Sequence, residues 1–273
     1  VVAQTKKPLR WVIVSDGSTD STDQIVSRYA ERYAWIDLVR LPERKTHDFG
    51  AKVRAFNAGY IRVQGLSYSA IGNLDADISF DPEYFSFLLS RLAQDQTLGV
   101  VGTPFLEKGR SYDYRFSCIS HVSGAWQLFR RQCFEEVGGY VPTTVGGVDL
   151  VAVLTARMKG WQTRSFTEKT CVHHRNMGKG KYGRLLTAFH GGRGDFVLGG
   201  HPLWEVCRSA YQMTIPPYIF AGLFRLAGYT WAAATQARKQ VGRDVITFRR
   251  AEQMARLRAF IGQRIPGMTK KAC

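Results

Sequence analysis

Short apolar runs alternate with amphipathic segments as far as about residue 170, and this alternation constrains the fold more than any other feature of the chain. It predicts an α/β protein in which helices cover both faces of a sheet. The expected strands are Leu9–Val14, Ile36–Leu41, Ser69–Leu74, Leu98–Thr103, Ala125–Phe129 and Trp161–Phe166. The expected helices are Thr22–Tyr33, Gly50–Val63, Pro82–Gln94 and Asp149–Lys159.

Two carboxylates stand one residue apart in Asp75-Ala76-Asp77, directly after the expected strand Ser69–Leu74. Because that strand is mostly small or apolar, it is typical of a covered parallel strand. Open α/β sheets bind ligands at the carboxyl ends of their strands, and two carboxylates there can hold a divalent cation that in turn binds a diphosphate. By itself, Asp-x-Asp is more often a turn or a helix cap.

A second acidic turn lies upstream, where the expected strand Leu9–Val14 runs into Ser15–Thr22 (SDGSTDST). This turn opens a helix, so hydroxyls and backbone N–H groups converge on one point. Ser, Thr and Asp also favour helix N-caps, which is the alternative for this turn alone. Asp16 and Asp75 are 59 positions apart and separated by a helix-strand-helix pattern. Two such acidic strand ends favour a ligand site.

The chain carries 38 basic and 22 acidic residues, which gives a formal net charge of +16. Basic proteins of this size usually meet nucleic acid, an anionic membrane or an anionic substrate. The sequence shows no zinc-finger spacing, RNA-binding aromatic motif or helix-turn-helix signature, so we expect no nucleic acid partner. The five cysteines show no metal-ligand spacing and are typical of reduced cytosolic thiols.

Six short motifs follow one another along the chain. They are Val12–Asp20 (VIVSDGSTD), Ala51–Gly59 (AKVRAFNAG), Asn73–Pro82 (NLDADISFDP), Ser123–Arg131 (SGAWQLFRR), Val137–Tyr140 (VGGY) and Gly146–Trp161, which begins GGVD and ends ARMKGW. In order and spacing these motifs resemble the family 2 glycosyltransferases with the GT-A fold. The resemblance covers roughly residues 1–180, and it is specific because several ordered motifs agree, although each motif alone is weak.

The resemblance implies an enzyme that transfers a sugar from a nucleotide-diphosphate donor, with Mn²⁺ or Mg²⁺ on the diphosphate and inversion at the transferred carbon. It implies a GT-A catalytic domain over residues 1–180, which leaves residues 181–273 as a helical, basic appendage. The implied acceptor is a polysaccharide or a lipid-linked glycan. Two alternatives stay open: a sugar nucleotidyltransferase of related fold, and a non-catalytic membrane-associated scaffold that binds nucleotide.

Four donor-side residues follow from the resemblance, position by position. Asp77 corresponds to the metal ligand. Asp75 corresponds to a residue that contacts the ribose or the water shell of the metal, and it counts as a second candidate ligand. Asp16 corresponds to the residue that hydrogen-bonds the base or the ribose, with Ser18 nearby.

Lys52 and Asn57 match the family's segment behind the nucleotide, although Lys52 is equally consistent with a solvated helix face. Asp149 matches the base that takes a proton from the acceptor hydroxyl, and by itself it also fits a helix cap. His173 and His174 lie where many GT-A enzymes supply a third metal ligand, and either of them fits that role.

Three family features are missing from the sequence. The usual Glu-Asp pair is reduced to Val148-Asp149, which removes a neighbouring acid. No Gln-x-x-Arg-Trp motif of the processive synthases occurs, which favours a single addition. The family's first strand and its Pro-x-x-Asn turn have no counterpart, so we expect a fragment of a longer protein. We also expect a gap between the strands ending at Val14 and Leu74.

Residues 218–234 are almost wholly apolar, with Arg225 as their only charge. A segment of 17 residues is at the lower limit for a membrane span, and an arginine at its middle is costly in hydrocarbon. Apolar residues recur at helical spacing among four arginines from Phe248 to Ile261, as in a membrane-surface helix. We expect a cytoplasmic protein attached to the anionic inner face of the cell membrane. The alternative is packed helices with a solvated basic face.

Asp195 and His201 are further acceptor-side candidates.

Overall fold

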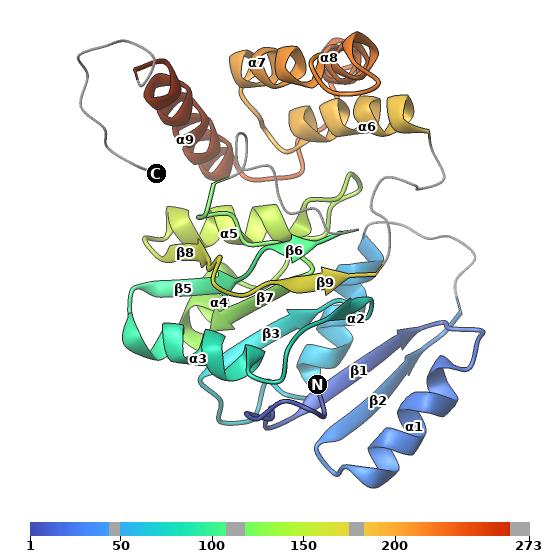
Figure 1. The fold of residues 1–273 in the computed structure, drawn as a ribbon. Coiled ribbons are helices and arrows are strands. Elements are labelled where there is room, and N and C mark those ends of the chain that lie inside the picture. Colours follow the sequence, from blue (N-terminus) through green and yellow to red (C-terminus); the bar gives the residue numbers. More distant parts are fainter. Residues whose placement is uncertain (44–49, 108–117, 175–182, 263–273) are drawn as a thin grey trace.

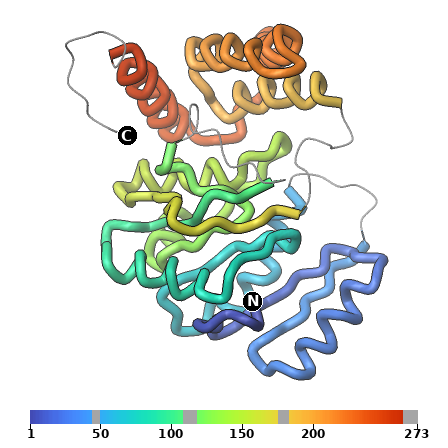
Figure 2. The backbone as a smooth tube through the Cα atoms, in the orientation of Figure 1, coloured from blue at the N-terminus to red at the C-terminus, as the bar shows by residue number. Residues whose placement is uncertain are grey.

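The computed structural model describes residues 1–43, 50–107, 118–174 and 183–262 (Figure 1). Its strands form a parallel pair, a four-stranded mixed sheet and a small three-stranded sheet. The helices of residues 183–262 lie together at one end of the molecule, as the backbone trace shows (Figure 2). The expected α/β class with a helical C-terminal part is confirmed.

The parallel pair consists of β1 (Trp11–Asp16) and β2 (Ile36–Leu41), with α1 (Thr22–Arg32) connecting them. The strands are in register along their full length. β2 begins and ends at the expected residues, whereas β1 is shifted two residues towards the C-terminus. Asp16 is therefore the last residue of β1, at the carboxyl end of the strand pair.

The mixed sheet contains four strands in the order β3 (Ala70–Leu74), β7 (Trp126–Arg130), β5 (Leu98–Gly102) and β8 (Gln162–Ser165). β7 is antiparallel to β3 and β5, whereas β5 and β8 are parallel. The expectation of a parallel strand before Asp75 was wrong, because β3 pairs antiparallel with β7. Small residues in β3 have another reason: a Cβ on Gly72 would lie 2.8 Å from the Trp126 ring.

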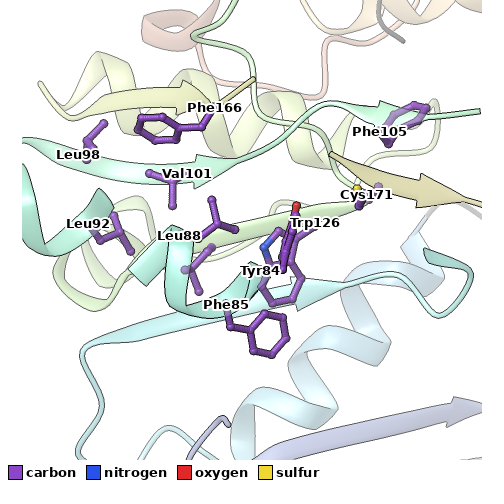
Figure 3. Packing of buried hydrophobic residues seen from close by; sticks show 12 residues of the cluster. Tyr84, Phe85, Leu88, Leu92, Leu98, Val101, Phe105, Trp126, Phe166 and Cys171 are labelled. Atoms are coloured by element: carbon purple, nitrogen blue, oxygen red, sulfur yellow. The ribbon is translucent and has the colours of Figure 1, made fainter. Parts of the chain in front are cut away.

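One hydrophobic core lies between the mixed sheet and α3 (Tyr84–Gln94) (Figure 3). Tyr84 and Leu88, one helical turn apart, are fully buried and belong to the same cluster as Val101 of β5. The helix expected here is confirmed, two residues shorter at its start. Its apolar stripe faces the sheet, as the amphipathic pattern predicts.

The opposite face of the same sheet carries a second core. Val100 of β5 packs there with Val53 of α2 (Gly50–Ile61). α4 (Arg131–Val137) and α5 (Val148–Met158) complete this layer. Successive residues of a strand point to opposite faces, so one strand serves both cores. Helices therefore cover both faces of the sheet, as predicted.

The small sheet consists of β4 (Ile78–Ser79), β9 (Cys171–His173) and β6 (Phe105–Leu106), in that order. β4 and β9 are antiparallel, with Ile78 opposite His173. The sequence did not predict this sheet, because strands of two or three residues show no periodicity. Contacts between distant segments fix them instead.

A gap separates β1 from β3, as expected. The two strands belong to different sheets, and a cavity of about 710 Å³ is lined by Val14 of β1 and Ile71 of β3. α2 spans the gap: Val53 lies in the second core, and Gly59 packs on β1, where a Cβ would lie 3.1 Å from the Val14 side chain. Among the described residues, a helix rather than strand pairing joins the two sheets.

The C-terminal group consists of α6 (Arg184–Val197), α7 (Pro202–Gln212), α8 (Ile219–Ala234) and α9 (Arg243–Gly262). α6 and α8 cross so closely that neither Gly192 nor Gly228 has room for a side chain. Arg157 of α5 donates to both carboxylate oxygens of Glu252 on α9, at 2.7 and 2.8 Å, and so fastens the group to the mixed sheet. Within the described ranges, no helix is long and apolar enough to cross a membrane.

The structure corrects the basic face expected on the last helix. Arg249 is 5% exposed and donates to Asp195 Oδ1 at 2.6 Å. Arg256 lies over the Trp204 ring, with 5.0 Å between its Cζ and the ring centroid. Of the four arginines in the pattern, only Arg258 is exposed. α9 therefore does not present a continuous basic surface.

Replacing Leu88 by Ala is expected to lower the free energy of unfolding by about 2–5 kcal/mol, because the change leaves a cavity in the core. Leu88 is fully buried, whereas Leu9 is 63% exposed, so Leu9→Ala is the matched control. Chemical denaturation of both variants measures the effect. Equal unfolding midpoints would contradict the packing of α3 described above.

Candidate active site

The candidate site lies beyond the end of β3. β1 and β3 point in the same general direction, so Asp16 and the segment Asp75–Asp77 both lie at the carboxyl end of a strand (Figure 1). Asp149 is in the first turn of α5, where the helix dipole favours a negative charge. The end of β3 and the start of α5 thus carry the acidic side chains of the candidate site, and Asp16 stands at the end of β1.

Lys52 fixes the position of Asp75. Its Nζ reaches from α2 and donates to Asp75 Oδ1 at 2.5 Å and to the Gly124 carbonyl at 2.9 Å. Burial raises the pKa of Asp75, and Lys52 lowers it. The carboxylates of Asp77 and Asp149 raise the same pKa. These four charged groups therefore lie within electrostatic reach of one another.

Gly124 connects the Lys52–Asp75 pair to Asp149. Its backbone N–H donates to Asp149 Oδ2 at 3.0 Å, while its carbonyl accepts from Lys52. A Cβ on Gly124 would lie 2.9 Å from Asp149 Cβ and from Oδ2, so a side chain does not fit without displacing the carboxylate. Glycine is needed here for close approach of the backbone to the carboxylate.

Asp77 lies beside His173 because β4 and β9 pair. The distance between His173 Nε2 and Asp77 Oδ1 is 3.6 Å, and the Asp77 carbonyl accepts from the His174 backbone N–H at 2.8 Å. The His174 ring is directed elsewhere, with Nε2 2.8 Å from Ser79 Oγ. The structure thus distinguishes two neighbours that the sequence left equivalent, and His173 is the one at Asp77.

Asp77 and His173 are chemically suited to a divalent metal ion. Two donors that share an ion at about 2.1 Å each are at most about 4.2 Å apart, and these are 3.6 Å apart. A carboxylate with an imidazole suits Mn²⁺ as well as other first-row ions. Among the described residues, no group of three or more His, Cys, Asp or Glu side chains could hold a metal ion.

The nucleotide-side residues are placed less closely together. Gly17 has a φ of 72°, which turns the chain after Asp16 and leaves Ser18 exposed. Asn57 is also exposed, about 140° around α2 from Lys52 at about 100° per residue. The structure therefore brings Lys52 to the acidic cluster. It does not bring Ser18 or Asn57 there, and their nucleotide contacts stay predictions.

His121 is a site neighbour that the sequence reasoning missed. Burial lowers its pKa, the Asp149 carboxylate raises it, and the guanidinium groups of Arg157, Arg256 and Arg208 lower it. Arg208 and Arg256 come from α7 and α9, so the C-terminal helices approach the Asp149 side of the site. No sequence motif could have indicated this, because His121, Arg208 and Arg256 are far apart along the chain.

The two acceptor-side candidates from the sequence have structural positions. Asp195 is 6% exposed and lies in the ion pair with Arg249. His201 caps α7, where its Nδ1 accepts from the Leu203 backbone N–H at 3.1 Å. Both side chains therefore stabilise the C-terminal group.

Comparison with known proteins gives the family. A model described as Glycosyl transferase family 2 matches residues 1–145. The poly-beta-1,6-N-acetyl-D-glucosamine synthase of Staphylococcus aureus (strain COL) is 25% identical over an alignment of 173 residues, and the match covers 56% of this chain and 40% of the synthase. The chain spans less than half the length of the curated relatives that it matches. Because the family model covers more than half of the chain, the chain belongs to glycosyl transferase family 2.

Among solved structures, the mannosyltransferase PcManGT from Pyrobaculum calidifontis, in complex with GDP-Man and Mn²⁺, is similar in fold. The TM-score is 0.52 at 19% sequence identity, over 97% of this chain and 81% of that one. At this identity the likeness shows the fold alone, which is GT-A. The family match favours a glycosyltransferase over the nucleotidyltransferase alternative.

Gly124→Ala is expected to lower the free energy of unfolding by about 1–3 kcal/mol, because the new Cβ must displace Asp149 or the loop before β7. Gly65→Ala is the matched control, since a Cβ there meets no atom within 4 Å. Thermal unfolding of both variants checks this. If the two alanine variants melt together, the contact between Gly124 and Asp149 is not as close as described.

Proposed function

We propose that this chain is the catalytic part of an inverting, metal-dependent glycosyltransferase that moves one sugar from a nucleotide-diphosphate donor to a polysaccharide or lipid-linked glycan. The observation that carries the proposal is the linkage through Gly124. The Gly124 carbonyl accepts from Lys52, which in turn holds the Asp75 carboxylate on the donor side. The Gly124 N–H donates to the Asp149 carboxylate on the acceptor side. Donor and base are thereby held in a fixed relation, which a transfer reaction requires.

On the donor side, Asp77 and His173 would hold Mn²⁺ or Mg²⁺. The bound ion neutralises charge that develops on the leaving diphosphate. Lys52 keeps Asp75 in place for the ribose and adds a positive charge nearby. Asp16, at the end of β1, is proposed to contact the base or the ribose. The Mn²⁺ and GDP-Man bound to the mannosyltransferase of similar fold support this assignment.

On the acceptor side, Asp149 is proposed to be the general base. Gly124 holds Oδ2, which leaves Oδ1 to accept the proton of the acceptor hydroxyl. The acceptor oxygen forms its bond to the anomeric carbon while the bond to the diphosphate breaks on the opposite side, so the configuration inverts. The electron pair of the broken bond leaves with the nucleotide.

We also propose that the enzyme works at the inner face of the cell membrane. The net charge of +16 favours an anionic surface, and a lipid-linked acceptor would be presented there. The Staphylococcus aureus relative is named as a polysaccharide synthase, which supports a glycan product. The missing Gln-x-x-Arg-Trp motif supports one addition per acceptor.

Asp149→Asn is expected to lower sugar transfer about 10²–10⁴-fold while nucleotide binding is kept, because the amide cannot take the acceptor proton. Transfer is measured with radiolabelled nucleotide sugars and membranes of the producing cell, and product mass gives the number of sugars added. Asp244→Asn, an exposed change in α9, is the control. Unchanged transfer by the Asp149 variant would remove it as base, and products with many added sugars would contradict single addition.

Metal dependence is tested by thermal unfolding with UDP, GDP, dTDP and CMP, each with and without Mn²⁺. One nucleotide together with Mn²⁺ should stabilise the protein, by about 2.7 kcal/mol at a hundredfold excess over Kd. His173→Gln should weaken the Mn²⁺-dependent part of this shift, because it removes a donor beside Asp77. His174→Gln should keep it, since the His174 ring lies at Ser79. Equal stabilisation by every nucleotide without Mn²⁺ would count against the metal site.

A further inference from the structure

The α7–α8 hairpin, which we define as residues 202–236, has its charged side chains inside. Glu205 is 0% exposed and Arg225 is 5% exposed. Arg225 Nη2 donates to Glu205 Oε2 at 2.9 Å, so the two charges neutralise each other between the helices. Arg208, the remaining charged residue of the hairpin, is half-buried. The arginine that made the apolar segment unsuitable for hydrocarbon is therefore turned away from the surface.

The outside of the α7–α8 hairpin is uncharged. Every exposed residue from Pro202 to Gln236 lacks a charge. Large apolar side chains dominate α8, with Phe220 and Trp231 each 60% exposed and Leu223 47% exposed. Such a continuous arrangement differs from single exposed apolar residues, which are normal on protein surfaces.

α1 shows what an ordinary exposed helix of the same chain looks like. Ile25 and Tyr29, one turn apart, are 49% and 46% exposed. Arg28, Glu31 and Arg32 are exposed beside them, so charges interrupt the apolar surface. The α7–α8 hairpin has no such interruption, although the chain as a whole is rich in charge.

Close packing holds this outward face in place. Gly228 approaches α6 so closely that a Cβ on it would lie 3.1 Å from the Arg193 backbone nitrogen. The Arg225 ion pair lies on the same inner side of α8. Rotating the helix to bury Phe220 or Trp231 would bring the arginine out and break both contacts. The apolar face is thus a fixed surface of the fold.

Positive charge adjoins the α7–α8 hairpin. In the described segment 183–262, five arginines are exposed but only one carboxylate, that of Asp244. Arg193 lies on α6 against α8, and Arg238 directly follows the hairpin. An apolar face bordered by cations complements a lipid surface with anionic headgroups, where cations meet phosphate and apolar side chains enter the acyl boundary.

We infer that the α7–α8 hairpin is the membrane-docking face of this protein and that its occupant is an anionic lipid bilayer. α8 has 16 residues and is about 24 Å long, which is shorter than the hydrocarbon core of about 30 Å. It therefore lies in the bilayer surface with Phe220, Leu223, Phe224 and Trp231 directed into the lipid. The inference deepens the proposed function, because it gives the surface from which a lipid-linked acceptor reaches Asp149.

Vesicle flotation of the full chain tests the docking face. The protein should float with vesicles of equal parts phosphatidylglycerol and phosphatidylcholine, and more weakly with phosphatidylcholine alone. Phe220→Glu with Phe224→Glu should lower the partition coefficient at least about tenfold, because two carboxylates must then enter the interface. Ile25→Glu with Tyr29→Glu, at the same spacing on α1, should float like the parent protein.

Three outcomes would overturn the inference: no flotation of the parent protein, equal flotation of the Phe220 and Phe224 variant, or equal loss in the α1 control. Light scattering adds a fourth, since a dimer that the Phe220 and Phe224 changes dissociate would make a second copy the occupant. Circular dichroism checks that both double variants are folded. Nucleotide-dependent stabilisation is measured without lipid, so failure of the donor site and failure of the docking face are separate results.

Discussion

The two hydrogen bonds of Gly124 are the interactions on which the rest of the site depends. Its carbonyl accepts from Lys52 on α2, and its N–H donates to Asp149 on α5. Lys52 also donates to Asp75. Lys52 and Gly124 together therefore link α2 and α5, on one face of the sheet, to the end of β3. The Lys52–Asp75 pair is about one third exposed, and such pairs contribute only about 0–1 kcal/mol. Its importance is therefore in positioning, since it sets where two carboxylates stand relative to each other.

This arrangement also explains how the chain accommodates the gap between its sheets. β1 and β3 are separated by a cavity, and α2 bridges them with Val53 in one core and Gly59 on the other sheet. The same helix carries Lys52, so the element that joins the sheets also carries the cation of the site. The relation between the Asp16 and Asp75 ends of the sheets consequently depends on helix packing. In the part of the chain that the structure describes, backbone pairing gives no direct link between them.

The local hydrophobic pattern of the sequence predicted the elements that bury one face against a neighbouring layer. β2 begins and ends where the apolar run does, and α3 follows its stripe, because both bury one face against a sheet. The small sheet was missed, and with it the distinction between His173 and His174. That distinction depends on a pairing across 95 residues, Ile78 with His173, which no window of sequence contains. The burial of Arg249 was missed for the same reason, because its partner, Asp195, lies on another helix. Asp75 and Asp77 could be named from the sequence because their motif follows a strand, and Lys52 because its segment matches the family, and their roles in catalysis stay predictions.

The Glu205–Arg225 pair shows how a buried charge can determine a surface. Ion pairs inside a protein add little net stability, because desolvation offsets most of their attraction. They do discriminate between arrangements, since an unpaired buried arginine is far less stable than a paired one. α8 is apolar on nearly all sides, and its hydrophobicity alone leaves its rotation poorly specified. Pairing of Arg225 with Glu205 selects the rotation in which Phe220 and Trp231 face outward. The Glu205–Arg225 pair, together with the close packing at Gly228, thus fixes which face of α8 is exposed.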